Sequence, residues 1–103
     1  MNDTQLEKMV WLFVWDKFSP DTGEVYEAFK NHGVSRKKIL EILQELESMY
    51  FVEGRFSDHQ GSFSSDRKKF PGKNMIWQSC ISNDRYTRDQ AITVYDSLRL
   101  EIK

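Results

Sequence analysis

Three consecutive cations stand at the start of a predicted helix, where their chemistry suits a phosphate group. Ser35 is a typical helix N-cap, and the next three residues are Arg36, Lys37 and Lys38. An exposed cation in the first helical turn opposes the helix dipole by roughly 0.3–1 kcal/mol. A bound phosphate would offset this repulsion and accept the unpaired N–H groups of the turn. The alternative is that the long side chains extend into water, where salt screens them and nothing binds.

A second group of cations follows in a segment rich in Gly, Ser, Asp and Pro. It consists of Arg55, Arg67, Lys68, Lys69 and Lys73. Lysine and arginine contact nucleic-acid phosphates and thereby set affinity and register. The run "DRKKF" is also compatible with a charged loop that only keeps a long connection soluble.

The net charge of −1 conceals an uneven distribution along the 103 residues. Residues 1–29 hold two basic and six acidic side chains, residues 30–73 hold nine and six, and residues 74–103 hold four and four. A non-specific nucleic-acid binder is usually basic overall, which this chain is not. A local basic face in the middle of the chain is still compatible with these totals.

No catalytic or cofactor-binding motif is found, so we expect neither an enzyme nor a bound cofactor or metal. His32 and His59 are far apart, and the chain has no Gly-rich phosphate loop, His-Glu zinc pattern or cysteine pair. Asp58, His59 and Asp66 lack the spacing of a metal site. The single cysteine, Cys80, is expected in the core and excludes an internal disulfide, which suits a reducing, cytoplasmic compartment.

The elements that position the cations begin with an apolar helix. Thr4 and Glu7 have the spacing of a capping box. The run "MVWLFVW", residues 9–15, is apolar nearly all round, which predicts a helix buried in the core or at a subunit interface. The run is too short to span a membrane, and it lacks the basic start of a signal peptide.

Two further helices are separated by a short turn. Ser19 and Pro20 are expected to begin the first of them, and Gly33 to end it in the left-handed conformation. Residues 35–50 carry the clearest helical pattern of the chain. Its expected buried face is Ile39, Ile42, Leu43, Leu46, Met49 and Tyr50. Its expected outward face is Lys37, Glu41, Gln44 and Ser48.

Two strands and a final helix complete the predicted elements. The segments "FVEGRF" (51–56) and "NMIWQSCI" (74–81) are rich in aromatic and branched residues, as strands are. The connection between them, residues 57–73, is long for a hairpin loop. Thr87 and Gln90 have capping-box spacing. They precede a stripe formed by Ala91, Tyr95, Leu98 and Ile102.

This order predicts an α+β, mostly helical fold: three helices, a two-stranded wing and an added C-terminal helix. Over about residues 5–81 it resembles the winged-helix (winged helix-turn-helix) superfamily, through the turn at 33–35 and the pattern "ILEILQELESMYFVEGRF". The stretch "TGEVYEAFKNHGVSRKKILEILQELESMYFVEGRF" loosely resembles the C-terminal winged-helix module of archaeal replication initiators. We therefore expect a winged-helix domain over residues 1–82 and a separate C-terminal helix over 83–103. The wing loop is longer than the family norm.

The resemblance implies a small DNA-binding protein, in particular a transcriptional regulator. Such proteins place the third helix in the major groove and the wing on flanking phosphates or in the minor groove. Transferred by position, the contacts to double-stranded DNA would come from the third helix and from the wing loop, residues 55–73. They are Ser35, Arg36, Lys37, Lys38, Gln44, Arg55, Arg67, Lys68, Lys69 and Lys73. Lys37 and Gln44 are expected to reach base edges.

The same helix also supports a protein-binding alternative. Glu41 falls on the expected outward face and Glu45 and Glu47 on either side of it, where acids repel phosphates. The second hypothesis is a winged-helix interaction module, including a small phage- or plasmid-type protein that binds a host complex. We also expect a homodimer through the first and last helices, which would place two third helices about one DNA turn apart.

Overall fold

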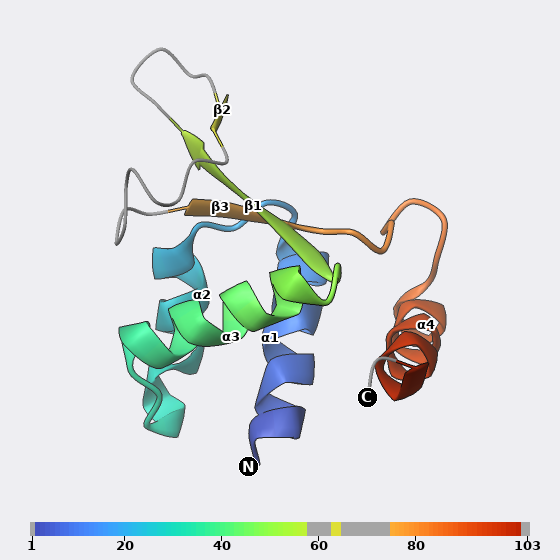
Figure 1. Cartoon of the computed structure of the whole chain (residues 1–103), viewed down its shortest axis with the longest axis horizontal. Coiled ribbons are helices and arrows are strands. Elements are labelled where there is room, and N and C mark those ends of the chain that lie inside the picture. The colour runs from blue at the N-terminus through green and yellow to red at the C-terminus, as the bar shows by residue number, and fades with distance from the viewer. Residues whose placement is uncertain (1, 58–62, 65–74, 102–103) are drawn as a thin grey trace.

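The computed structural model describes residues 2–57, 63–64 and 75–101, and these form an α+β, mostly helical fold (Figure 1). The helices and strands are, in chain order, α1 (Asp3–Lys17), α2 (Thr22–Phe29), η1 (Lys30–His32), α3 (Arg36–Ser48), β1 (Val52–Ser57), β2 (Phe63–Ser64), β3 (Met75–Ser79) and α4 (Arg88–Glu101). In Figure 1, α1, α2 and α3 gather on one side of the sheet, and α4 lies beyond the end of β3. No helix within the described residues combines the length and hydropathy that crossing a membrane requires.

The caps of α1 and α2 are not the predicted residues. Asn2 caps α1: its side chain accepts the N–H of Gln5 at 2.8 Å, so the expected cap at Thr4 is wrong. Asp21 caps α2 in the same reciprocal manner, in place of Ser19. An N-cap needs extended backbone, which Asn2 and Asp21 have, whereas Ser19 lies in the left-handed region at φ 62°.

The signals around α3 and α4 are confirmed. Gly33 adopts φ 75°, the left-handed conformation that glycine tolerates without steric cost. Ser35 caps α3 by accepting the N–H of Lys38 at 3.1 Å. At α4, the N–H of Thr87 donates to the side chain of Gln90 at 3.0 Å, and the N–H of Gln90 donates back at 3.3 Å. Each of these caps joins residues three positions apart, so the whole signal lies within a short stretch of the sequence.

The strands form an antiparallel sheet whose described order is β2-β1-β3. The predicted strands 51–56 and 74–81 correspond to β1 and β3, and β2 was not expected. The register places Val52 opposite Ser79 and Arg55 opposite Ile76. The other edge of β3 is also paired, because Asp21 bridges Ile76 and the N–H of Trp77 donates to Pro20 O at 2.8 Å. The sheet is therefore tied to the connection between α1 and α2.

A buried hydrogen bond joins the first residue of α2 to the core. Trp77 is fully buried, and its indole N–H donates to the hydroxyl oxygen of Thr22 at 2.9 Å. The same hydroxyl exchanges two longer bonds, both 3.4 Å, with the backbone of Met75. Thr22 thus supplies the hydrogen-bond acceptor for the indole N–H of Trp77 in otherwise apolar surroundings.

We expect Thr22→Val to destabilise the fold by about 1–3 kcal/mol, because it leaves the buried indole N–H without an acceptor. Thr22→Ser keeps the hydroxyl and removes only a methyl group, so it should cost about 1 kcal/mol or less. Urea denaturation of the two variants measures the difference. A valine variant as stable as the serine variant would contradict this role of Thr22.

The last helix packs against the first. Ala91 and Tyr95 of α4 are buried in the same cluster as Trp11, and the rings of Tyr95 and Trp11 stack with centroids 4.6 Å apart. Among the described residues, three ion pairs connect α1 with α4. They are Lys8–Asp96 at 3.0 Å, Asp16–Arg88 at 3.7 Å and Glu7–Arg99 at 3.8 Å. The two helices that were expected to mediate dimerisation therefore cover part of each other within one chain.

Two residues predicted to be buried are exposed. Cys80 was expected in the core, but it lies at the surface. The alternation that buries Trp77 and Ile81 turns Gln78 and Cys80 outward. Tyr50 was assigned to the buried face of α3, but the helix ends before it and its side chain is exposed. Helical periodicity could not place Tyr50, because it no longer belongs to the helix.

Candidate nucleic-acid interface

The buried and outward faces of α3 are the predicted ones, apart from its C-terminal end. Ile39, Ile42, Leu43 and Leu46 are buried against α1, α2 and the sheet. The exposed face consists of Lys37, Glu41, Gln44 and Ser48. This packing fixes the orientation of the helix, so its exposed side chains are presented on a rigid support.

The three cations of the first turn have different surroundings. Lys37 is exposed at the N-terminal end of the outward face. Lys38 is half-buried, and its ammonium lies 3.7 Å from Asp3 Oδ2 at the start of α1. Arg36 is exposed and lines a shallow surface hollow with residues of α1 and α2. The described first turn contains no acidic residue that would neutralise Lys37.

The charge of α3 changes along its length. Beyond the basic first turn, the exposed residues include the carboxylates Glu41 and Glu45. Phosphate groups are attracted to the N-terminal turn and repelled from the following turns. The exposed face of α3 is therefore suited to phosphate contact at one end only.

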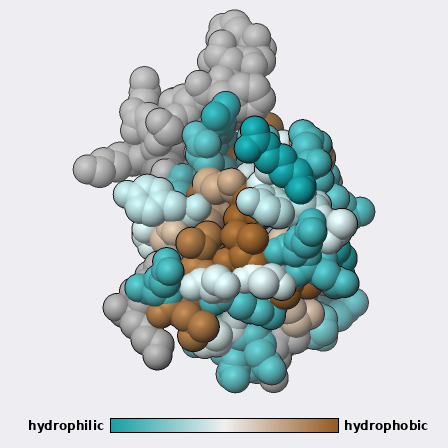
Figure 2. Space-filling model, turned by 90° about the vertical axis from the view of Figure 1, so that its right-hand side faces the viewer, coloured by the Kyte–Doolittle hydropathy of each residue, from teal (hydrophilic) through white to brown (hydrophobic). Residues whose placement is uncertain are grey.

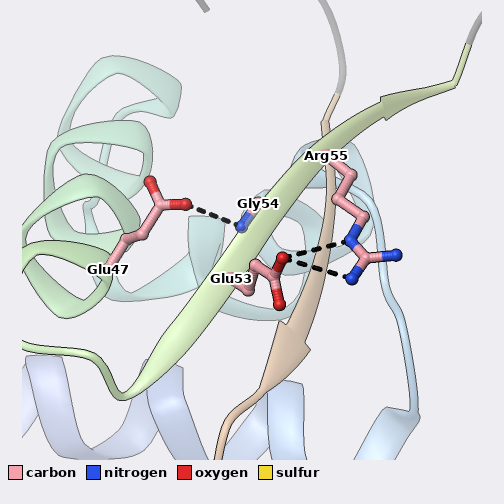
Figure 3. Close-up of polar contacts among 4 residues, drawn as sticks. All are labelled: Glu47, Glu53, Gly54 and Arg55. Atoms are coloured by element: carbon pink, nitrogen blue, oxygen red, sulfur yellow. Dashed lines mark hydrogen bonds and ion pairs between the residues drawn. The ribbon is translucent and has the colours of Figure 1, made fainter. Parts of the chain in front are cut away.

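The third acid of this helix points elsewhere. Glu47 reaches from α3 toward β1, where its Oε2 accepts the N–H of Gly54 at 2.9 Å (Figure 3). This contact satisfies a backbone donor on the side of β1 that faces away from β3. Glu47 was expected beside the outward face, but its tertiary contact turns it away from that face.

Arg55, the described cation of the group predicted to form wing contacts, lies in β1 and is already paired. Arg55 donates from Nε and Nη2 to Glu53 Oε1, at 3.3 and 3.2 Å (Figure 3). Both side chains are exposed, and an exposed ion pair is worth about 0–1 kcal/mol. Arg55 can therefore exchange this partner for a phosphate at little cost.

The remaining wing residues that were predicted to contact DNA are not part of the described structure. Arg67, Lys68, Lys69 and Lys73 lie outside the described residues, as do the loop side chains considered for a metal. Among the residues that are described, no group of three or more His, Cys, Asp or Glu side chains could hold a metal ion.

Sequence patterns missed a hollow at the C-terminal end of α3. It has a volume of about 470 Å³ and is lined mainly by Gln44, Glu47, Ser48, Tyr50, Glu53 and Cys80. Partial burial raises the pKa of the Cys80 thiol, and the carboxylates of Glu53 and Glu47 raise it further. The available signal in the sequence was the acidic pair beside Tyr50, but only the fold brings Cys80 next to them.

The sequence matches no protein-family model, and no curated protein or solved structure shows significant similarity to it. Three features of the described residues remain as a basis for function. They are the basic first turn of α3, the acidic turns that follow, and the hollow beside Tyr50.

Proposed function

We propose that this chain is a winged-helix protein that binds double-stranded DNA through the first turn of α3, as a small transcriptional regulator. The close pair of α2 and α3 has the helix-turn-helix order, and the hairpin of β1 and β3 follows α3 directly. The pairing of β3 with residues 20–21 and the bond from the N–H of Gly54 to Glu47 support the proposal, because together they hold the hairpin, α2 and α3 in one frame. A rigid frame can place a helix and a wing on the same duplex.

The position of Lys37 is the main observation that supports this proposal. This residue lies in the first turn, on the outward face, and its ammonium makes no ion pair or hydrogen bond within the described part of the chain. A phosphate held there would meet the ammonium and the positive end of the helix dipole together. Ser35 and Arg36 would assist from either side, and Lys38 would contribute by orienting the helix against Asp3.

Base recognition would be limited to a few side chains. Lys37 and Gln44 can reach base edges from the outward face, and Glu41 between them can accept a hydrogen bond from cytosine N4. We propose that phosphate contacts at the first turn supply most of the affinity. Arg55 and the cations of residues 67–73 would add contacts from the wing.

We expect Lys37→Ala to weaken DNA binding and to make the slope of log K against log salt shallower by about 0.9, the loss of one phosphate contact. Fluorescence anisotropy with a labelled duplex over a salt series measures both quantities. Lys37 is the best single substitution, because Lys38→Ala would also remove the ion pair with Asp3.

Arg85→Ala is the matched control, because it removes one exposed positive charge beside α4, away from α3. It should leave the salt slope unchanged. Equal losses of DNA affinity in the two variants would show that binding depends only on the net charge of the protein. Absence of wild-type binding to random and genomic duplexes at low salt would refute the DNA proposal and favour the protein-binding alternative.

A homodimer is part of this proposal. Figure 2 shows the side of the molecule that carries α4, and hydrophobic side chains gather near the centre of that side. The large hydrophobic side chains exposed on the two helices are Met9 of α1 and Leu98 and Leu100 of α4. Sedimentation equilibrium that detects only monomer at micromolar concentration would remove the dimer and leave the DNA proposal intact.

A further inference from the structure

Tyr50 occupies a position that normally favours glycine. It is the first residue beyond the C-cap of α3, and its φ is 65°. The N–H of Phe51 donates to Leu46 O at 2.9 Å and that of Tyr50 to Glu47 O at 3.0 Å, which is the Schellman pattern that ends a helix. A side chain in this left-handed conformation is strained relative to glycine.

Packing within the chain does not explain the aromatic ring at this position. Tyr50 is 84% exposed, the largest exposure among the large hydrophobic residues described. The ring therefore gains little from burial to offset the strain. Exposed tyrosines supply rigid, amphipathic contact area and are enriched in protein–protein interfaces. A role in contacting a partner accounts for both its exposure and its place.

The hollow beside Tyr50 is negatively charged. Glu47 and Glu53 line it, and none of its described lining residues is lysine or arginine. Both bonds from Arg55 end on Glu53 Oε1, so Glu53 Oε2 lies outside that pair. The same negative charge acts on the thiol of Cys80. Burial is the largest cause of its raised pKa, and both carboxylates raise this pKa further. A cation is favoured in this hollow and a phosphate is repelled.

We propose that the hollow is a docking site for an arginine side chain of a protein partner. A guanidinium is planar, so it can donate to a single carboxylate oxygen such as Glu53 Oε2 while it stacks on an aromatic ring, whereas an ammonium is a compact point charge. Glu53 supplies the carboxylate, Glu47 adds negative charge, and Tyr50 supplies the ring. The site lies at the opposite end of α3 from Ser35 and does not depend on the DNA proposal.

Cys80 allows a direct test, because it is the only cysteine and lies in the lining of the hollow. The rate at which methanethiosulfonates modify it is measured with a cationic and an anionic reagent of similar size. We expect the ratio of the cationic to the anionic modification rate to be at least several-fold higher at Cys80 than at free cysteine. Glu53→Gln should reduce this preference, and Arg55→Ala, which removes the cation beside Glu53, should increase it.

Occupancy by arginine is tested with the peptide acetyl-Gly-Arg-Gly-amide at millimolar concentration. We expect it to slow the modification of Cys80 by an uncharged methanethiosulfonate at least two-fold, and the lysine peptide to do so much less. Tyr50→Gly should abolish this protection while raising the melting temperature, since glycine relieves the strain. Tyr50→Phe should keep the protection, because the ring remains.

Each rate is compared with and without peptide in the same variant, so changes in the intrinsic reactivity of Cys80 cancel. A merely structural role for Tyr50 would leave protection unchanged in Tyr50→Gly. No charge preference, no protection by the arginine peptide, or equal protection by the lysine peptide would each overturn the proposal.

Discussion

Replacing Gly54 with alanine is expected to destabilise the fold by about 3 kcal/mol, the upper range for adding an atom to a packed core. A Cβ at this position would lie 2.6 Å from Trp77 Cζ3 and 2.7 Å from Met75 Cε. Trp77 cannot turn away easily, because it is fully buried and its indole is bonded to Thr22. In denaturant unfolding, the loss of stability is measured as a lower midpoint concentration of the denaturant.

Gly33→Ala is the matched control for this substitution. Among the described residues, apart from Gly33 and its chain neighbours, no atom lies within 4 Å of a Cβ at Gly33, but its φ of 75° disfavours a side chain. We therefore expect a smaller cost of about 1 kcal/mol, from backbone strain alone. Equal costs at the two positions would show that Trp77 and Met75 move aside, and the steric explanation for Gly54 would fail.

Replacing Tyr95 with alanine is expected to cost about 3–5 kcal/mol, as for other large aromatic residues in a core. Tyr95 is only 2% exposed and its ring lies between Trp11 and Phe51, at centroid distances of 4.6 and 4.4 Å. With Ala91, it is one of the two buried residues by which α4 is attached to the rest of the core. Chemical denaturation gives the free energy, and hydrogen exchange shows where protection is lost.

We expect the Tyr95→Ala variant to lose protection first in the amides of α4, while α1 and α3 stay protected. Leu98→Ala is the control on the same helix, because Leu98 is 41% exposed and should contribute less than about 1 kcal/mol. Uniform loss of protection throughout the molecule would contradict a separate attachment of α4 through Tyr95.

The phenol of Tyr95 also predicts a pH dependence. Burial raises its pKa to about 12, compared with about 10 in an unfolded chain. Because the folded value is the higher one, the neutral phenol contributes fully to stability below pH 10, and this contribution is lost as the pH rises toward 12. Tyr95→Phe lacks this ionisation, so its stability should fall less steeply over the same pH range.

Local signals in the sequence located most of α3. The cap at Ser35, the left-handed Gly33 and the buried face of the helix follow from residues within two turns of one another. The same holds for the capping box of α4. The outward position of Lys37 and Gln44 was therefore predictable, because helical geometry alone sets it.

The partners of the charged residues were not predictable in this way. Lys38 meets Asp3 from another helix, and Glu47 meets the backbone of Gly54 in a strand. The exposed position of Tyr50 depends on where α3 stops. Each outcome is set by how segments pack together, which composition and periodicity do not encode.

The sequence by itself therefore determined the order of the elements and the basic first turn of α3, because hydrophobic periodicity and caps act over a few residues. Only the tertiary structure decided which cations stay available for a phosphate, since ion pairs form between distant segments. It also brought Cys80 beside Glu47, Glu53 and Tyr50 and so created the acidic hollow. The same helix thus presents opposite charge at its two ends, with a different partner proposed for each.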